Sequence, residues 1–257
     1  MSGTFAPRPG AAPLVRMVRS QARMETRLLL RNGEQLLIAV VIPLVVLSGG
    51  LFAARRFDIA LSGRPVDLLT PGVLALAVMS TSFTSLAIAT GFERRYGVLK
   101  RLGSSPLPRS GLLAGKVGAL LLVELLQLVV LGGAGLLLGW RPELSAAAVT
   151  GALLVALSGT AAFASLGLLM AGTLRAEATL AAANLVYLLL MVGGAVVLPA
   201  TTYGEVGRVL PWLPSGALGG GMRDALLDGA FPLGPVLVLA AWAAVGTFLT
   251  SRTFRWE

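Results

Sequence analysis

The chain has 257 residues, of which 56% are hydrophobic and 13% charged, and it contains neither cysteine nor histidine. Soluble globular domains usually carry about 25% charged residues, so this composition indicates a protein whose main solvent is lipid. Without cysteine and histidine the chain lacks the usual residues of disulfide frameworks, thiol nucleophiles, imidazole bases and most zinc or haem sites. We therefore expect no catalytic residue and no metal site in this chain.

Six apolar segments are long enough to cross a bilayer, because about 20 helical residues span a hydrocarbon core of roughly 30 Å. We place these spans at about residues 35–54, 69–92, 111–140, 144–173, 178–198 and 232–250. They form one transmembrane domain over residues 35–250, between an N-terminal region of residues 1–34 and a short tail of residues 251–257. The predicted fold class is an all-α polytopic membrane protein.

The net charge is +9, from 21 Lys and Arg residues against 12 Asp and Glu residues. With the N-terminus placed in the cytoplasm, 15 of the basic residues fall in cytoplasmic segments and six fall on the opposite side. Basic residues are retained on the cytoplasmic side of membrane proteins. We therefore expect both termini in the cytoplasm, and the positive charge needs no nucleic acid as a partner.

A helical pattern precedes the first span, over Leu14–Leu29. Arg16, Arg19, Arg23 and Arg27 recur every three to four residues and share one face, while apolar residues spread over the other. This pattern predicts an amphipathic helix that lies in the membrane interface and contacts lipids. A solvated basic leader that merely satisfies the charge rule is the alternative.

The densest charged stretch, residues 93–109, lies between the second and third spans. Tyr96, Leu99 and Leu102 recur at intervals of three residues, which predicts a short amphipathic helix. Pro106 then breaks the helix, because proline lacks an N–H group and disfavours helix at the residue before it. Such a helix between two spans could transmit a push from a soluble partner, and an ordinary basic loop is the alternative.

The same stretch resembles the signature of the type 2 ATP-binding-cassette exporter permeases. The resemblance rests on Glu93-Arg94-x-x-Gly97-x-Leu99, on Ser105-Pro106-Leu107-x-Arg109, and on Gly115-Lys116 at the start of the third span. Arg95 and Val98 stand where the family pattern has an acid and a threonine. The six spans, the N-terminal interfacial helix and the long connection before the sixth span are similar to the same family.

The resemblance implies that residues 93–109 are a coupling helix that docks on a separate nucleotide-binding subunit. The implied coupling residues are Glu93, Arg94, Gly97, Leu99, Leu102, Pro106 and Arg109, with Gly115 and Lys116 beginning the next span. It also implies a second permease copy or a related permease, a bacterial cytoplasmic membrane, and ATP with Mg²⁺ on the partner subunit. The chain itself has no Gly-x-x-x-x-Gly-Lys-Ser/Thr loop that could cradle phosphates.

One acid lies deep in a span, because Glu124 follows Lys116 by eight residues, or about 12 Å of helix. A carboxylate at that depth costs roughly 2.5 kcal/mol or more, so we expect it to face the bundle interior. It is either a substrate or proton contact, or a protonated acid hydrogen-bonded to a neighbour such as Gln127, Asn184 or Tyr187. We treat these four residues as a possible substrate pathway.

The connection over residues 199–231 has too many prolines and glycines for a seventh span, yet it is too apolar to extend into water. We expect two short helices, at about residues 204–210 and 221–227, that dip into the outer leaflet as a re-entrant hairpin. The resembling family has such a hairpin above its transport pathway. A loose extracytoplasmic loop is the alternative.

Together these features favour the permease subunit of an ATP-driven exporter, which is not itself an enzyme. The apolar spans suit an amphiphilic or hydrophobic substrate such as a drug, a lipid or a glycoconjugate. A gradient-driven carrier would need several intramembrane ionisable groups and broken helices in two repeats, whereas this sequence has one buried acid. A non-transporting scaffold that recruits a cytoplasmic protein through its basic loop is a third possibility.

Overall fold

The computed structural model describes residues 12–31, 33–57, 63–103 and 108–254, and no strand occurs within those ranges. The first part comprises α1 (Leu14–Arg31), α2 (Gly33–Arg56), α3 (Pro65–Met79), the π-helical turn η1 (Ser80–Ser85), α4 (Leu86–Arg95), α5 (Val98–Gly103) and α6 (Arg109–Leu137). The second part comprises α7 (Ala146–Thr173), α8 (Ala176–Gly193), the 3-10 segments η2 (Ala200–Arg208) and η3 (Leu210–Trp212), α9 (Pro214–Leu226) and α10 (Leu233–Thr253).

Within the described residues, six helices are long and apolar enough to cross a membrane, which confirms the predicted all-α polytopic fold class. They are Ala39–Arg56, Pro65–Arg95, Ala114–Leu137, Ala146–Thr173, Ala176–Gly193 and Leu233–Thr253. The second span begins earlier than expected, because Arg64 is extended and Pro65 occupies the first helical position, which proline favours. The fifth ends earlier, at Gly193, because Ala195 has a φ of 54° that an α-helix does not allow.

The second span, formed by α3, η1 and α4, is the centre of the bundle. It contacts α2, α6, α7, α8 and α9, and its middle residues from Val73 to Met79 are fully buried. At η1 the Phe83 ring meets Phe163 of α7 edge-on, with 6.1 Å between the ring centroids. The hydrophobic core of the protein therefore surrounds this one helix.

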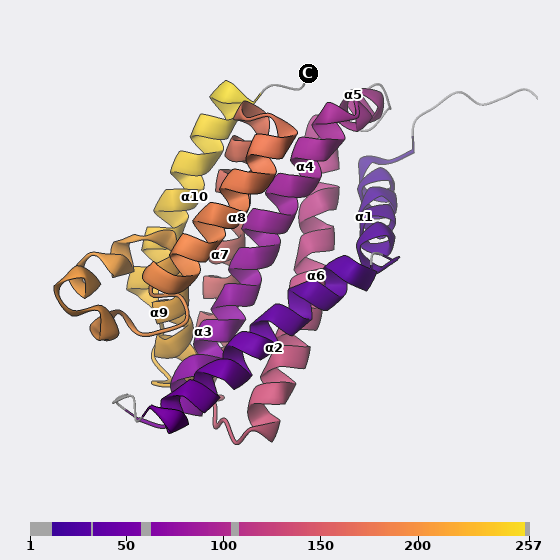
Figure 1. The fold of residues 1–257 in the computed structure, drawn as a ribbon. Helices are drawn as coiled ribbons and strands as arrows, with labels where there is room; N and C mark the ends of the chain where they lie inside the picture. The colour runs from indigo at the N-terminus through magenta and orange to yellow at the C-terminus, as the bar shows by residue number, and fades with distance from the viewer. Residues whose placement is uncertain (1–11, 32, 58–62, 104–107, 255–257) are drawn as a thin grey trace, which may run out of the picture.

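The two ends of the bundle differ in what they carry (Figure 1). One end, which we call the α5 end, holds α5, the start of α6 and the end of α10. The other, which we call the Arg64 end, holds the connection that leads into α3 and the connection from α6 to α7. The helix α1 lies beside the first half of α6, toward the α5 end.

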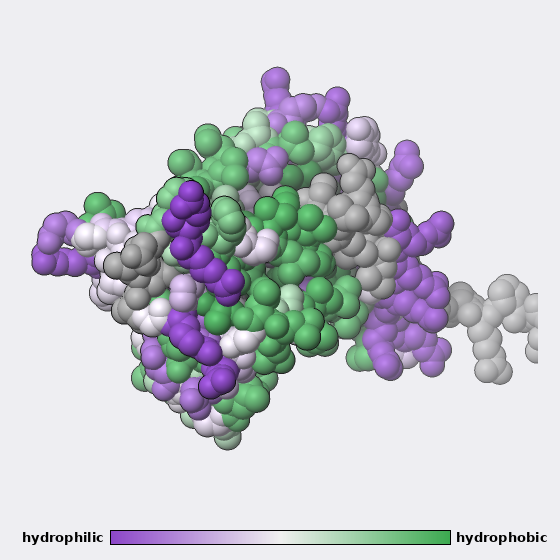
Figure 2. Space-filling model, turned by 60° about the horizontal axis from the view of Figure 1, so that its bottom comes forward, coloured by the Kyte–Doolittle hydropathy of each residue, from purple (hydrophilic) through white to green (hydrophobic). Residues whose placement is uncertain are grey.

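The outer surface of the spans is apolar. Leu122, Leu125 and Val129 on α6 and Leu185 and Leu189 on α8 are each more than half exposed. Figure 2 shows hydrophobic side chains over much of the face in view, with hydrophilic side chains gathered in separate patches. An exterior of this kind is stable when lipid rather than water surrounds it.

The connection before the last span differs from its predicted form. Its main helix is α9, which starts at Pro214 instead of residue 221, and almost all of it is buried against α3, α7 and α10. The expected helix at residues 204–210 is replaced by the 3-10 segment η2, because Gly204 has a φ of 57° that breaks a regular helix. The residues of α9 thus pack inside the bundle, whereas Val206, Val209 and Trp212 before it are each more than half exposed.

Candidate functional site

A buried lysine joins three helices at the α5 end. The Lys116 Nζ atom of α6 lies 2.6 Å from Oε1 of Glu93 in α4 and 3.2 Å from Oε1 of Glu25 in α1. The Lys116 side chain is only 7% exposed. One ammonium group therefore holds two carboxylates, and it connects the two spans that flank α5 with the N-terminal helix.

The glycine before this lysine sets the distance between α1 and α6. A Cβ atom at Gly115 would lie 2.6 Å from Cγ of Gln21, so a larger residue would push α1 away. Gln21 is itself buried and donates a hydrogen bond of 2.8 Å to Glu25. Gly115 thus lets α1 pack closely on α6, and Lys116 neutralises Glu25 of α1.

The four arginines predicted to form one face of α1 are all exposed. Arg16, Arg19, Arg23 and Arg27 point away from the bundle, while the opposite side packs on α6. The helix predicted for this region therefore forms, and the arginine face is open to solvent or lipid phosphates. Its position in the membrane interface stays a prediction.

The remaining residues of the predicted coupling segment form a corner between α4 and α5. Arg94 donates a hydrogen bond to the carbonyl oxygen of Leu174, and Arg95 pairs with Glu177, so α4 is tied to the turn between α7 and α8. Gly97 has a φ of 69°, which lets the chain turn from α4 into α5 without strain.

The predicted apolar residues lie at the corner before α5 and within α5. Tyr96, at the corner, is 66% exposed, and Leu102 is half-buried. Leu99 lies within α5, and Arg109 is the first residue of α6. Pro106 lies outside the described residues. The structure therefore has a short helix that projects from the α5 end between two spans, as the sequence predicts.

The acid in the third span has a different partner from those expected. Oε2 of Glu124 accepts a hydrogen bond of 2.7 Å from the Thr160 hydroxyl group of α7, and the Glu124 residue is 3% exposed. Its other carboxylate oxygen, Oε1, is buried without a hydrogen-bond partner among the described residues. The sequence does not identify Thr160 as the partner of Glu124, because a threonine in an apolar span gives no sign of which neighbouring helix it faces.

Gln127 makes a second polar contact one turn along α6. Its Oε1 atom accepts a hydrogen bond of 2.7 Å from Thr81 in η1, and its Nε2 atom donates one of 2.9 Å to the Ala39 carbonyl group in α2. This side chain links three spans near the middle of the bundle.

The four predicted pathway residues do not form one cluster. Glu124 and Gln127 share a face of α6, whereas Tyr187 of α8 is buried and hydrogen-bonded to Ser80 in η1. Asn184 is exposed on the outer side of α8, and its place in a transport pathway stays a prediction. The π-helical turn supplies the partners of Gln127 and Tyr187, and its run of serine and threonine residues was the signal available in the sequence.

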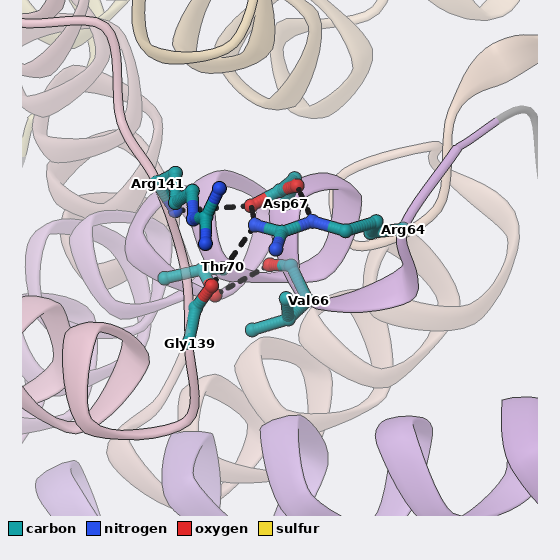
Figure 3. Close-up of polar contacts among 6 residues, drawn as sticks. All are labelled: Arg64, Val66, Asp67, Thr70, Gly139 and Arg141. Atoms are coloured by element: carbon teal, nitrogen blue, oxygen red, sulfur yellow. Dashed lines mark hydrogen bonds and ion pairs between the residues drawn. The ribbon is translucent and has the colours of Figure 1, made fainter.

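At the Arg64 end an ion pair joins two connections (Figure 3). The Arg64 guanidinium group contacts both carboxylate oxygens of Asp67, at 2.6 and 2.9 Å, and donates to the Gly139 carbonyl group at 2.9 Å. Asp67 also accepts a hydrogen bond of 3.0 Å from the backbone N–H group of Arg141. This network, the Arg64 clamp, fixes the start of α3 to the chain between α6 and α7.

A buried arginine organises the chain after α8. Arg223 of α9 is 6% exposed and donates hydrogen bonds to the carbonyl groups of Ala195, Val196 and Val197 at 2.9–3.2 Å, with a longer contact to Leu198. Burial lowers the pKa of Arg223 to about 10, so the guanidinium group stays charged at neutral pH. The sequence placed this residue among the loop charges, because the tertiary contacts that bury it are not visible there.

Comparison with known proteins places the chain in a family of membrane transporters. No curated protein sequence matches the chain. A protein-family model described as "ABC-2 family transporter protein" matches residues 63–252, which cover all spans but the first. Because this match extends over well more than half of the sequence, the chain belongs to the ABC-2 transporter family.

Proposed function

We propose that this membrane permease works as the transmembrane subunit of an ATP-driven exporter. The observation that carries the proposal is the attachment of α5. This short exposed helix is fixed through Glu93 and Lys116 to the two spans on either side of it, and through Glu25 to α1. A force applied to α5 therefore reaches α4, α6 and α1 together.

In this proposal a separate ATP-binding subunit docks on α5 and holds both ATP and Mg²⁺. Two permease copies, or one copy with a related chain, enclose the transport pathway. Closure of the ATP-binding subunits moves α5 and shifts the bundle between an inward-open and an outward-open state. The free energy for the change between states comes from ATP, because ATP binds more tightly to the ATP-binding subunit in one of these states than in the other.

The proposed cargo is an amphiphile or a hydrophobic molecule moved out of a bacterial cytoplasmic membrane. The described spans have apolar surfaces, and most of their buried polar side chains bond to their own helix or to a neighbouring helix. Such an interior favours a substrate whose own surface is largely apolar, such as a drug, a lipid or a glycoconjugate.

The test is co-purification with the ATP-binding subunit encoded beside the permease. Tyr96→Asp places a charge on the exposed corner of α5 and should abolish the association and the transport-stimulated ATPase activity. Arg19→Asp, on the exposed face of α1, is the matched control and should leave the association intact. Glu93 is unsuitable for this test, because its replacement would also break the buried pair with Lys116.

If the wild-type chain forms no stable complex with that subunit, the exporter proposal is wrong. Retained binding by the Tyr96→Asp variant would instead exclude the α5 corner as the docking surface.

A gradient-driven carrier is the second candidate, and the unpartnered Oε1 atom of the buried Glu124 favours it. In that case proteoliposomes should accumulate substrate from an imposed proton gradient without ATP. Glu124→Gln should abolish this uptake, whereas Gln127→Glu should not restore it in the same protein. Transport that requires ATP and survives Glu124→Gln would exclude the carrier.

A further inference from the structure

A cavity of about 650 Å³ lies between the η2–α9 segment and the first turns of α10. Most of its wall is apolar or consists of glycine backbone, and three charged residues also line it, namely Arg208, Arg223 and Asp224. Figure 1 shows the segment between α8 and α9 curving away from the bundle beside α10 and α9. Its volume lies within the range of small-molecule sites, about 300–1,000 Å³.

An apolar groove of about 380 Å³ continues from this cavity along α10. The cavity and the groove share Trp212, Leu237 and Val238, and the groove extends to Val245. From Leu237 to Val245 the helix rises about 12 Å. Because α10 is one of the spans, the groove follows the direction in which a lipid acyl chain lies.

The junction between cavity and groove is held in place by a tryptophan. Trp242 of α10 donates a hydrogen bond of 2.9 Å from Nε1 to the carbonyl oxygen of Trp212 in η3. The Trp212 side chain itself is 69% exposed, so it forms an open wall at the point where the two spaces meet. The two spaces therefore form a single site with a polar end and an apolar end.

The polar end offers a carboxylate that the protein does not use. Asp224 is half-buried, and within the described part of the chain its side chain has no hydrogen-bond or ion-pair partner. Burial and the nearby Asp228 raise the pKa of Asp224, and the charge of Arg223 opposes that rise. The donors of Arg223 are already directed at the carbonyl groups after α8, so the carboxylate remains open to a ligand.

The polar end also offers a guanidinium group that can change partners. Arg208 pairs with Glu205 at 2.8 Å, but both side chains are about 80% exposed. An exposed pair of this kind contributes little to stability, about 0–1 kcal/mol in general, so a phosphate could displace Glu205 at small cost. The polar end therefore presents one acceptor for a cation and one donor for an anion.

We propose that this site binds a membrane amphiphile whose head group carries a primary ammonium group and a phosphate. Asp224 accepts hydrogen bonds from the ammonium group, Arg208 donates to the phosphate, and an acyl chain fills the groove along α10. A purely anionic head group would face the Asp224 carboxylate, and a quaternary ammonium head group has no N–H donor for it. The proposal does not depend on ATP-driven export.

The test uses the full chain in detergent, with native mass spectrometry to count bound lipids. Phosphatidylethanolamine, phosphatidylcholine and phosphatidylglycerol of identical acyl chains are the probes. The ethanolamine lipid should bind about tenfold more tightly than the other two, the effect of one charge-assisted contact. Asp224→Asn should remove this preference and leave the binding of the choline lipid unchanged.

A second variant tests the cavity independently of its charge. A Cβ atom at Gly220, which lines the cavity, would meet no atom within 4 Å, so the side chain of Gly220→Leu begins in open space beside the cavity. This variant should lower binding of the ethanolamine lipid about tenfold. Gly133→Leu on α6 is the matched control, since Gly133 is equally open and lies outside the cavity.

Three results would overturn the proposal. Asp224→Asn could keep the ethanolamine preference, or the glycerol lipid could bind best, and either result would exclude the assigned head group. Alternatively, Gly220→Leu could alter the oligomeric state while lipid binding stays the same, which would show that a second copy of the chain covers the cavity.

Discussion

Two buried basic side chains, those of Lys116 and Arg223, make polar contacts that join separate parts of this permease. Lys116 neutralises Glu93 and Glu25 at the α5 end, and Arg223 holds the carbonyl groups after α8. Each charge is buried, and each is compensated by groups distant in sequence, which lie in other helices for Lys116 and in the chain after α8 for Arg223. Removing such a charge leaves its partners buried and unpaired, which costs more than the pair itself contributes.

For this reason we expect Lys116→Met to lower the free energy of unfolding by about 3–5 kcal/mol. The measurement is unfolding of the detergent-solubilised protein, followed by tryptophan fluorescence. Arg19→Met removes an exposed charge from α1 and should change stability by less than about 0.5 kcal/mol. Equal effects of the two substitutions would contradict the role of Lys116 as the link between the helices.

Arg223→Met should also destabilise the protein, by about 3 kcal/mol, because several carbonyl groups lose a charged donor. Arg223→Lys should recover part of this loss, since an ammonium group cannot reproduce the planar fork of donors. The same unfolding assay applies, with the exposed Arg208→Met as control. If Arg223→Met is as stable as the control, the carbonyl contacts do not hold this segment.

At the scale of elements, two contacts position the helices that flank the proposed docking segment. The helix α1 packs on α6 at Gly115 and Gly118, and the corner between α4 and α5 turns at Gly97. The first contact needs glycine at Gly115, where a Cβ atom would lie 2.6 Å from the Gln21 side chain, and the second needs glycine because φ is positive. The glycines at these two places therefore have structural roles that differ from general helix packing.

The docking of α1 can be tested with a disulfide, because the natural chain has no cysteine. A Cβ atom at Gly118 would lie 3.6 Å from Cβ of Ala22, which matches the separation of about 3.5–4.5 Å in disulfides. Ala22→Cys combined with Gly118→Cys should therefore cross-link on mild oxidation. Ala22→Cys with Gly133→Cys, displaced by about 22 Å along α6, should not. Failure of the first pair to cross-link would mean that α1 does not rest on α6.

At the scale of the whole molecule, ion pairs gather at the two ends of an apolar bundle, and one buried acid, Glu124, lies between them. The α5 end carries the buried triad and the exposed corner, and the other end carries the Arg64 clamp. A protein that alternates between states open on opposite sides must change contacts at both ends. In the proposed exporter, the buried triad and the Arg64 clamp are therefore the contacts that such a change would rearrange.

The excess of basic residues in the loops at the α5 end predicts that this end faces the cytoplasm. Tyr96→Cys should then react with a membrane-impermeant maleimide only after the cells are opened, and Glu205→Cys should react in intact cells. Both positions are well exposed, so lack of access within the protein would not hide the result. The reverse labelling pattern would invert the orientation.

The sequence by itself determined the number of spans, the helix over Leu14–Leu29, the presence of a short helix within residues 93–109 and the family, while the start of that short helix after Gly97 came from the structure. These features depend on local composition, on periodicity and on a motif, which the order of residues records directly. The sequence also showed that Glu124 is a buried acid, since its depth follows from its distance along one helix.

Only the tertiary structure decided which side chains meet. Glu124 pairs with Thr160, Lys116 joins two acids, and Arg223 lies inside the bundle, because helices far apart in sequence pack there. In an apolar chain almost any face of a span can be buried, so hydropathy does not specify which neighbour a polar residue faces. Asn184 illustrates the limit, since it lies in a span and yet faces outward.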